Sequence, residues 1–192
     1  MRLLLLALPF ALLPLAVAHA ADEHDHDHEH GSLGAHVHGV ARLDMALDGR
    51  TLELELDTPA MNIVGFEHPA TTDADKMTLA LAKETLLKPH ALFSLPEAAG
   101  CTATKQRVES TLFGDKDDDD HEHADGDAAE HEHSEIHGHY QLTCSAPNVL
   151  NKLDLTQLFK SFPATQTIQV QLVTPKHQMG AEVRPSNPVV KF

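Results

Sequence analysis

The sequence lacks a basic surface and the common motifs of hydrolytic enzymes. Its 192 residues include 14 Lys and Arg against 29 Asp and Glu, and aromatic residues make up only 4%. Because nucleic-acid binding requires basic side chains that neutralise phosphates, this balance excludes DNA and RNA as partners. Neither an H-E-x-x-H nor a G-x-S-x-G motif occurs, whereas a catalytic zinc site needs fixed ligands and a positioned base. We therefore predict that the protein is not an enzyme.

Long hydrophobic runs are also lacking, except for one at the N-terminus. Residues 3–17 form an apolar run that follows Arg2 and contains two prolines. Residues 18–20 (Ala-His-Ala) then match the small-x-small pattern of a signal-peptidase site. The run is short for a membrane span, which needs about 20 residues. We expect residues 1–20 to be a signal peptide and the remaining chain to be a soluble periplasmic protein.

Cysteine is scarce, with only Cys101 and Cys144 present. An oxidising compartment favours their pairing, and the C-x-x-C spacing typical of thiolate metal sites is absent. We therefore favour a disulfide over a pair of thiolate ligands. In the chain-entropy model, a cross-link that closes a loop of this length stabilises the fold by about 4 kcal/mol.

Two acidic segments account for the whole net charge of −15. Residues 22–38 contain five acidic residues, and residues 115–139 contain eleven together with one lysine. Segments of this composition have too few apolar side chains to form a packed core. We expect residues 21–34 to be a disordered His/Asp-rich tail. Residues 35–192 should form a single domain that carries residues 115–139 as a disordered insertion, removable without loss of the fold.

The rest of the chain shows strand and helix patterns. Apolar residues alternate over residues 43–47 and 52–56, around an Asp-Gly turn, which predicts a β-hairpin. Further strands are predicted at residues 101–113, 136–144, 168–172 and 181–183, with the first two of these pairing so that the two cysteines lie opposite each other. Helices are predicted at residues 73–88, with Met77, Ala80, Leu81 and Leu87 near helical spacing, and at residues 156–162. The expected fold class is α+β, with an antiparallel sheet of hairpins and one or two helices.

Histidine is the most informative residue type. Twelve of the sixteen histidines lie in the two acidic segments, all in H-x-H pairs. In an extended chain, residues i and i+2 point to the same side, and neutral imidazole binds Zn²⁺, Cu²⁺ and Ni²⁺ well. Neighbouring carboxylates either bind the metal or orient the imidazole. The predicted ligands in these segments are His24, His26, His28, His30, His36, His38, His121, His123, His131, His133, His137 and His139.

A more rigid metal site is expected where the tail joins the domain. If the sheet brings Glu67 and His68 beside His36 and His38, three histidines and a carboxylate would form a closed four-ligand zinc site. A structural turn at residues 67–68 is the alternative interpretation. The isolated residues His90 and His177 are expected to be surface histidines.

These ligand types do not select a single metal, because imidazole binds zinc, copper and nickel alike. The absence of an M-x-M cluster argues against Cu(I). Two functions follow: a periplasmic zinc-binding protein that captures Zn²⁺ and assists its uptake, or a protein that sequesters excess copper or nickel.

Four motifs occur along the chain: residues 36–39 (HVHG), 59–68 (PAMNIVGFEH), 158–163 (LFKSFP) and 170–175 (VQLVTP). In this order they resemble the periplasmic zinc-uptake accessory proteins that were first catalogued as a domain of unknown function. The resemblance covers essentially the whole chain after the predicted signal peptide. It implies a zinc-regulated protein that works beside a zinc ABC transporter, with that transporter or a periplasmic zinc-binding protein as partner. It assigns no individual metal ligand.

Overall fold

A computed structural model of the chain describes residues 37–114 and 134–192. The predicted signal peptide, the predicted tail and most of the predicted insertion lie outside these ranges. Within them, six strands form one sheet in the order β3-β4-β2-β1-β6-β7. The strands are β1 (Val40–Asp48), β2 (Thr51–Pro59), β3 (Cys101–Glu109), β4 (Glu135–Cys144), β6 (Thr167–Val173) and β7 (Gln178–Val183).

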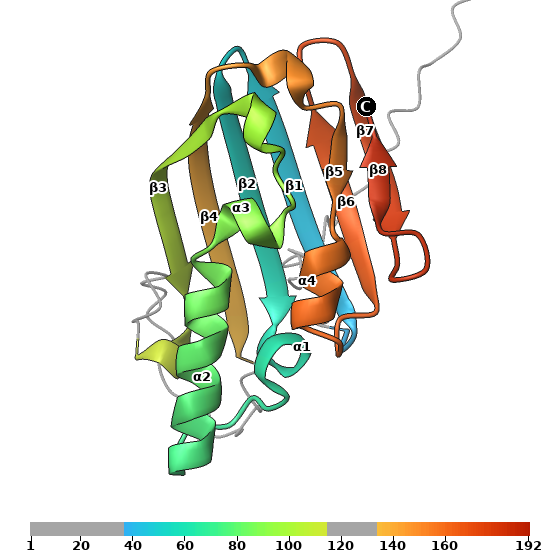
Figure 1. Cartoon of the computed structure of the whole chain (residues 1–192). Coiled ribbons are helices and arrows are strands. Elements are labelled where there is room, and N and C mark those ends of the chain that lie inside the picture. The colour runs from blue at the N-terminus through green and yellow to red at the C-terminus, as the bar shows by residue number, and fades with distance from the viewer. Residues whose placement is uncertain (1–36, 115–133) are drawn as a thin grey trace, which may run out of the picture. The chain divides into compact units, whose positions relative to one another are not determined.

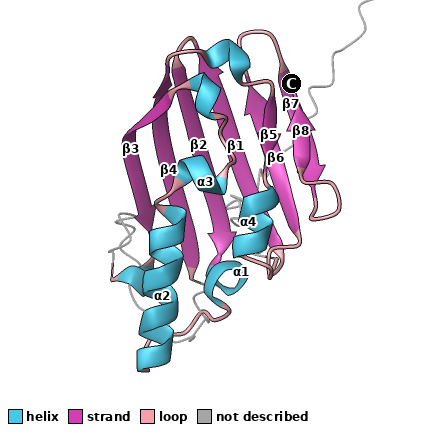
Figure 2. Ribbon diagram, viewed as in Figure 1, coloured by secondary structure: helices cyan, strands magenta, loops and turns pink. Residues whose placement is uncertain are grey.

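Helices lie on one side of this sheet, as Figures 1 and 2 show. The α-helices are α1 (Ala60–Val64), α2 (Asp73–Leu86), α3 (Pro89–Leu92) and α4 (Thr156–Ser161). Two short strands, β5 (Lys152–Asp154) and β8 (Val189–Lys191), form a separate two-stranded sheet. The fold class is therefore α+β, as the sequence predicts. No helix in the described ranges is long and apolar enough to cross a membrane.

Alternation along the strands decides which side chains are buried. In β2, Leu52, Leu54 and Leu56 are buried, whereas Glu53 and Glu55 between them are exposed. Full burial of one leucine side chain stabilises a fold by about 1.5–3 kcal/mol. Among the described residues, the buried core contains no histidine. The core is therefore built from other side chains than the predicted metal ligands.

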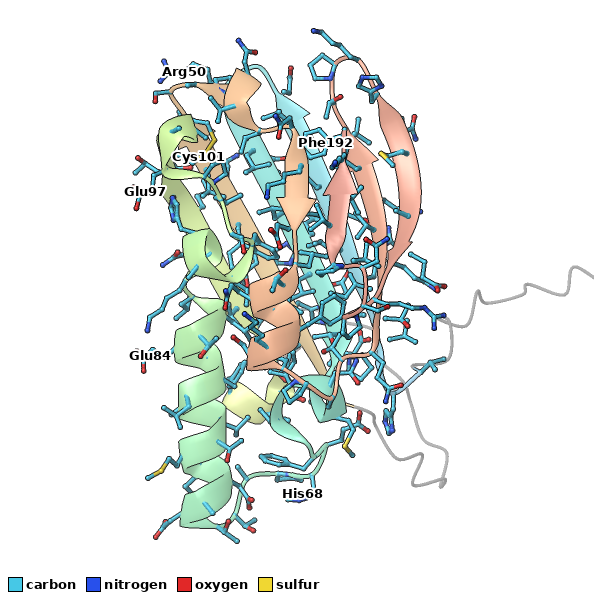
Figure 3. The ribbon with its side chains drawn as sticks, turned by 45° about the vertical axis from the view of Figure 1, so that its right-hand side comes forward. Arg50, His68, Glu84, Glu97, Cys101 and Phe192 are labelled. Carbon is cyan, nitrogen blue, oxygen red and sulfur yellow. A yellow bond between two sulfur atoms is a disulfide. The ribbon has the colours of Figure 1, made fainter. Side chains whose placement is uncertain are left out.

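The predicted disulfide is confirmed. Cys101 and Cys144 lie opposite each other in the register of β3 and β4, and their sulfur atoms are bonded. Figure 3 shows this bond near one end of the sheet and His68 near the other. The cross-link therefore closes the base of the β3–β4 hairpin, far from the end where the hairpin strands are joined by residues 110–134.

One pairing in the sheet differs from the predicted series of hairpins. β1 and β6 pair in parallel, with Val40 opposite Thr167, so the sheet is mixed rather than purely antiparallel. Parallel neighbours need a long crossover, and here the chain passes through β2, β3 and β4 before it returns. Alternation in the sequence identifies the buried face of a strand but not its neighbour, which is why this pairing was not predicted.

The predicted helices are present with small changes at their ends. Thr72 caps α2 and exchanges hydrogen bonds with Asp75, at 3.1 and 3.2 Å. α2 ends at Leu86 rather than at residue 88, and α4 ends at Ser161. The short helices α1 and α3 were not predicted, because a helix of about one turn has too few residues to show a periodic pattern.

The apolar residues noted at helical spacing are not the buried face of α2. Met77 and Leu81 are 66% and 58% exposed, while Leu79, Ala82 and Leu86 are buried. Both sets recur at helical spacing, so periodicity alone could not choose between them. The contacts of α2 with the rest of the molecule make the choice.

Two predicted boundaries around the insertion also change. The strand expected at residues 101–113 ends at Glu109, and Ser110 then caps the short turn η2 (Thr111–Phe113). β4 begins at Glu135, and Ile136 is fully buried. Removal of residues 115–139 would therefore delete half of a central strand. The structure places residues 135–139 in a paired strand rather than in a disordered insertion, so we predict that this part of the segment is needed for folding.

Candidate metal-binding site

A buried amide fixes the chain where β1 begins. The Asn62 side chain is 1% exposed; its Oδ1 accepts a hydrogen bond from the backbone N–H of Gly39 at 2.6 Å. Its Nδ2 donates to the carbonyl of Val40 at 2.9 Å and to the hydroxyl of Thr58 at 3.1 Å. A buried polar group without a partner costs about 1–3 kcal/mol. Asn62 therefore ties the start of β1 to the end of β2.

This connection places His38 beside Glu67. Nε2 of His38 is 3.1 Å from Oε1 of Glu67, and the Glu67 side chain is mostly buried. Gly39 follows with a φ of +85°, a left-handed conformation that glycine adopts at little cost. The structure thus brings together one predicted histidine and the predicted carboxylate.

The other members of the predicted four-ligand site are placed differently. Nδ1 of His68 is 3.1 Å from the carbonyl oxygen of Pro69, and its ring stacks on Phe66 with centroids 4.8 Å apart. His36 lies outside the described residues, so the complete set remains a prediction. Within residues 37–114 and 134–192, no three His, Cys, Asp or Glu side chains are grouped so that they could hold a metal ion.

Glu67 also meets the end of the insertion. The hydroxyl of Ser134 donates to the backbone carbonyl of Glu67 at 3.2 Å, and the carbonyl of Ser134 accepts from the backbone N–H of Ala60 at 2.8 Å. His38 is the first described histidine of the N-terminal His-rich segment, and Ser134 is the first described residue of the insertion. The described ends of both His-rich segments therefore converge on Glu67.

His137 and His139 point away from the core. Ile136, Gly138 and Tyr140 are buried in β4, so the two histidines lie on the opposite, outer face of the sheet. Gly138 between them has no room for a larger residue, because a Cβ there would lie 2.6 Å from the Tyr140 hydroxyl. Burial of Tyr140 raises the pKa of its hydroxyl. The position between the two outward histidines therefore requires glycine, because the Tyr140 side chain occupies the space on the core side of the strand.

Carboxylates surround His137 on the outer face. Nδ1 of His137 is 2.8 Å from Oδ1 of Asp57 on β2, and its Nε2 is 3.6 Å from Oε2 of Glu135. The hydrogen bond with Asp57 raises the pKa of His137 against the effect of burial, and the negative charges of Asp57, Glu135 and Glu109 act in the same direction. The same hydrogen bond lowers the pKa of Asp57.

His139 has a looser environment. Its Nδ1 is 3.6 Å from Oε1 of Glu55, which is longer than a hydrogen bond. Arg107 lies opposite His139 on β3 and forms an ion pair with Glu109. One acidic column on β2 (Glu53, Glu55 and Asp57) therefore faces the column on β4 that contains both histidines.

The remaining predicted ligands lie outside the described residues. They are His24, His26, His28, His30, His36, His121, His123, His131 and His133. His90 and His177 are both exposed, as expected, and the Nε2 of His90 is 2.6 Å from the backbone carbonyl of Cys101.

Sequence reasoning missed the carboxylates that contact the histidines of β4. Glu55 and Asp57 alternate with leucines in β2, so their outward direction was visible in the sequence. Their position beside His137 and His139 depends on the register of β2 against β4, and no local pattern reports that register. Glu135 was within the predicted insertion and was counted only as negative charge.

Comparison with known protein families decides the identity. The model of the ZrgA family, described as zinc uptake proteins, matches residues 35–192. The chain belongs to the ZrgA family. This confirms the resemblance drawn from the four motifs, and a zinc-uptake family agrees with imidazole and carboxylate groups at the protein surface. The family description names transport and no catalytic reaction. No curated protein matches the sequence.

Proposed function

We propose that this ZrgA-family protein captures Zn²⁺ in the periplasm and assists its uptake without catalysing a reaction. The observation that carries the proposal is the convergence of His38 and Ser134 on Glu67. His38 and Ser134 are the described ends of the two His-rich segments, and both contact Glu67, so the two segments connect to the domain at neighbouring positions. Zinc is the cargo of such a protein rather than a resident cofactor.

The separation of the core from the histidines supports reversible binding. A protein whose folding depends on zinc, such as a zinc finger, must unfold to release it. Here the described core contains apolar side chains and no histidine. Zinc can therefore bind and leave while the sheet stays folded, as transfer to an uptake system requires.

The choice of zinc over copper or nickel follows from the family. Imidazole and carboxylate groups bind all three ions, so the ligands alone leave sequestration of copper or nickel open. The zinc-uptake family of this chain favours zinc. A zinc ABC transporter, or a periplasmic zinc-binding protein that serves it, is the partner that fits this role, and the predicted signal peptide would deliver the chain to that compartment.

A growth experiment tests the role in uptake. Cells that lack the protein should grow more slowly than wild-type cells when a chelator limits zinc, and added zinc should restore their growth. Their tolerance of excess copper and nickel should be unchanged. Increased sensitivity to copper or nickel with normal growth in low zinc would instead support sequestration and contradict the proposal.

A further inference from the structure

His137 is held in one orientation by a carboxylate on the neighbouring strand. Asp57 lies directly opposite His137 in the register of β2 and β4, and its Oδ1 is 2.8 Å from Nδ1 of the ring. In the neutral ring Nδ1 keeps the hydrogen that it donates to Asp57, so the lone pair lies on Nε2. Histidines that bind metals in proteins are usually fixed in this way through the second ring nitrogen.

A second carboxylate lies next to that lone pair. Oε2 of Glu135 is 3.6 Å from Nε2 of His137, which is longer than a hydrogen bond. Zinc binds imidazole nitrogen and carboxylate oxygen at about 2.0–2.2 Å, and two ligands of one tetrahedral ion are therefore separated by roughly 3.4 Å. The spacing of the two atoms is close to that of two ligands of a single zinc ion.

The backbone beneath these side chains is well supported. Glu135 and His137 are residues i and i+2 of β4, so they share the outer face. At His137 the strand is paired with Asp57 of β2 on one side and with Glu109 of β3 on the other. Ile136 between the two side chains is fully buried in the core. A strand that is paired on both sides therefore presents both groups and fixes their spacing.

We propose that Nε2 of His137 and the carboxylate of Glu135 bind one Zn²⁺ ion on the outer face of β4, with Asp57 as the positioning residue behind the ring. This inference rests on the proposed function, because it takes zinc as the cargo. Since no three ligand-type side chains are grouped for a metal within the described residues, that part of the chain contributes two ligands. Sites with fewer than four protein ligands keep positions for exchange. The site therefore suits transfer of zinc rather than storage.

His139 offers a comparison on the same strand. Its Nδ1 is 3.6 Å from Oε1 of Glu55, but no carboxylate of the described residues is hydrogen-bonded to its ring. The imidazole of His139 is therefore free to adopt either tautomer. Zinc should bind first at His137 and only at higher concentration at His139.

Imidazole nitrogen NMR spectra of residues 21–192, labelled with ¹⁵N, test the proposal. The ring of His137 is assigned by its absence in a His137→Gln variant. In the metal-free protein, above the pKa of the ring, His137 should carry its hydrogen on Nδ1. Addition of Zn²⁺ should shift the Nε2 resonance of His137, and this response should disappear in Glu135→Gln.

Two matched variants separate positioning from surface charge. Asp57→Asn should weaken zinc binding at His137 about 10–100-fold, the usual effect of losing a group that orients a metal-binding histidine. Glu53→Gln removes the same charge from the same face of β2, where Glu53 accepts a hydrogen bond from Gln141 at 2.9 Å, and should change the affinity less than twofold. Equal weakening by both variants would contradict the positioning role of Asp57.

The outcome also distinguishes this inference from the proposed function. If calorimetry shows that residues 21–192 bind zinc to saturation while Nε2 of His137 does not shift, the site at His137 is wrong and zinc capture stands. If the chain binds no zinc by calorimetry, the proposed function itself fails. If the neutral His137 ring of the metal-free wild-type protein carries its hydrogen on Nε2, the proposed orientation of this ring by Asp57 is wrong.

Discussion

At the scale of single residues, Asn62 is a buried polar side chain with three hydrogen-bond partners. Its amide satisfies backbone groups of Gly39 and Val40 and the hydroxyl of Thr58. The sequence motif at residues 59–68 includes Asn62, yet only the structure shows what the amide does. It joins the start of β1 to the end of β2 and thereby places His38 beside Glu67.

Replacement of Asn62 tests this arrangement. Asn62→Ala should lower the free energy of unfolding by about 1–3 kcal/mol, because buried backbone groups lose their partners. Asn148→Ala, at an exposed position, should change it by less than about 0.5 kcal/mol. Urea denaturation of the metal-free proteins measures both. Equal stability of the two variants would show that the Asn62 amide is not needed to hold β1 and β2 together.

The pair formed by Asp57 and His137 should make stability depend on pH. Because the pKa of His137 is raised in the folded protein, the protonated ring contributes to the free energy of unfolding. This contribution is complete below the unfolded pKa of about 6.5 and is lost as pH rises through the pKa of the folded protein. Because the pKa of Asp57 is lowered, its carboxylate also contributes to the free energy of unfolding. This contribution is present above the unfolded pKa of about 3.9 and is lost as pH falls through the pKa of the folded protein. The pair should therefore stabilise most between roughly pH 4 and pH 6.5.

Unfolding of wild-type and His137→Gln proteins in the presence of chelator measures this dependence. Compared with the wild type, His137→Gln should lose more stability at pH 5.5 than at pH 8.5. The difference should be small because His137 and Asp57 are both partly exposed and solvent screens their interaction. The same substitution at exposed His177 controls for the loss of an imidazole. A larger loss at pH 8.5 would have the wrong sign for this ion pair.

At the scale of elements, β4 has two functions that the sequence did not separate. Its buried residues belong to the core, and its outward residues His137 and His139 belong to the His-rich segment. The acidic composition of residues 115–139 hid the beginning of the strand. The composition of a segment indicates its charge and its candidate ligands. It does not show that Ile136 is buried, because that burial depends on partners far away in the sequence.

Two deletions distinguish these functions. Removal of residues 115–133 should leave the far-UV circular dichroism spectrum and the cooperative thermal transition of the domain in place, because closure entropy depends only weakly on loop length. Removal of residues 115–139 should abolish the transition, because it also removes Ile136 and the pairing of β4 with β2 and β3. A cooperative transition in both proteins would show that the first half of β4 is dispensable.

The sequence predicted elements better than their partners. Alternation correctly identified the hairpin of β1 and β2, and the cysteines correctly indicated the pairing of β3 and β4. The parallel pairing of β1 with β6 was missed because it joins residues more than a hundred positions apart. The buried side of α2 was missed because Met77 and Leu79 begin two equally periodic apolar sets. At the candidate metal-binding surface, the histidines were visible in the sequence, but the carboxylates beside them required the register of β2 and β4.

At the scale of the whole molecule, the apolar core and the candidate metal ligands use different side chains of one chain. The disulfide closes one end of the β3–β4 hairpin, and the described ends of both His-rich segments meet at Glu67. Under the proposed function, a protein of the ZrgA family built in this way would keep its fold while its zinc content changes. Zinc uptake requires such independence, since the cargo must be released.

Calorimetric titration with Zn²⁺ tests the central claim most directly. It compares residues 21–192 with the same chain lacking residues 115–133 and with a His36→Ala/His38→Ala/His68→Ala variant, each folded as judged by circular dichroism. The account predicts several zinc ions for the intact chain, a clear fall in stoichiometry after the deletion, and the loss of at least one tight site in the triple variant. Unchanged stoichiometry after the deletion, together with unchanged tight binding in the triple variant, would contradict the claim that these histidines capture zinc.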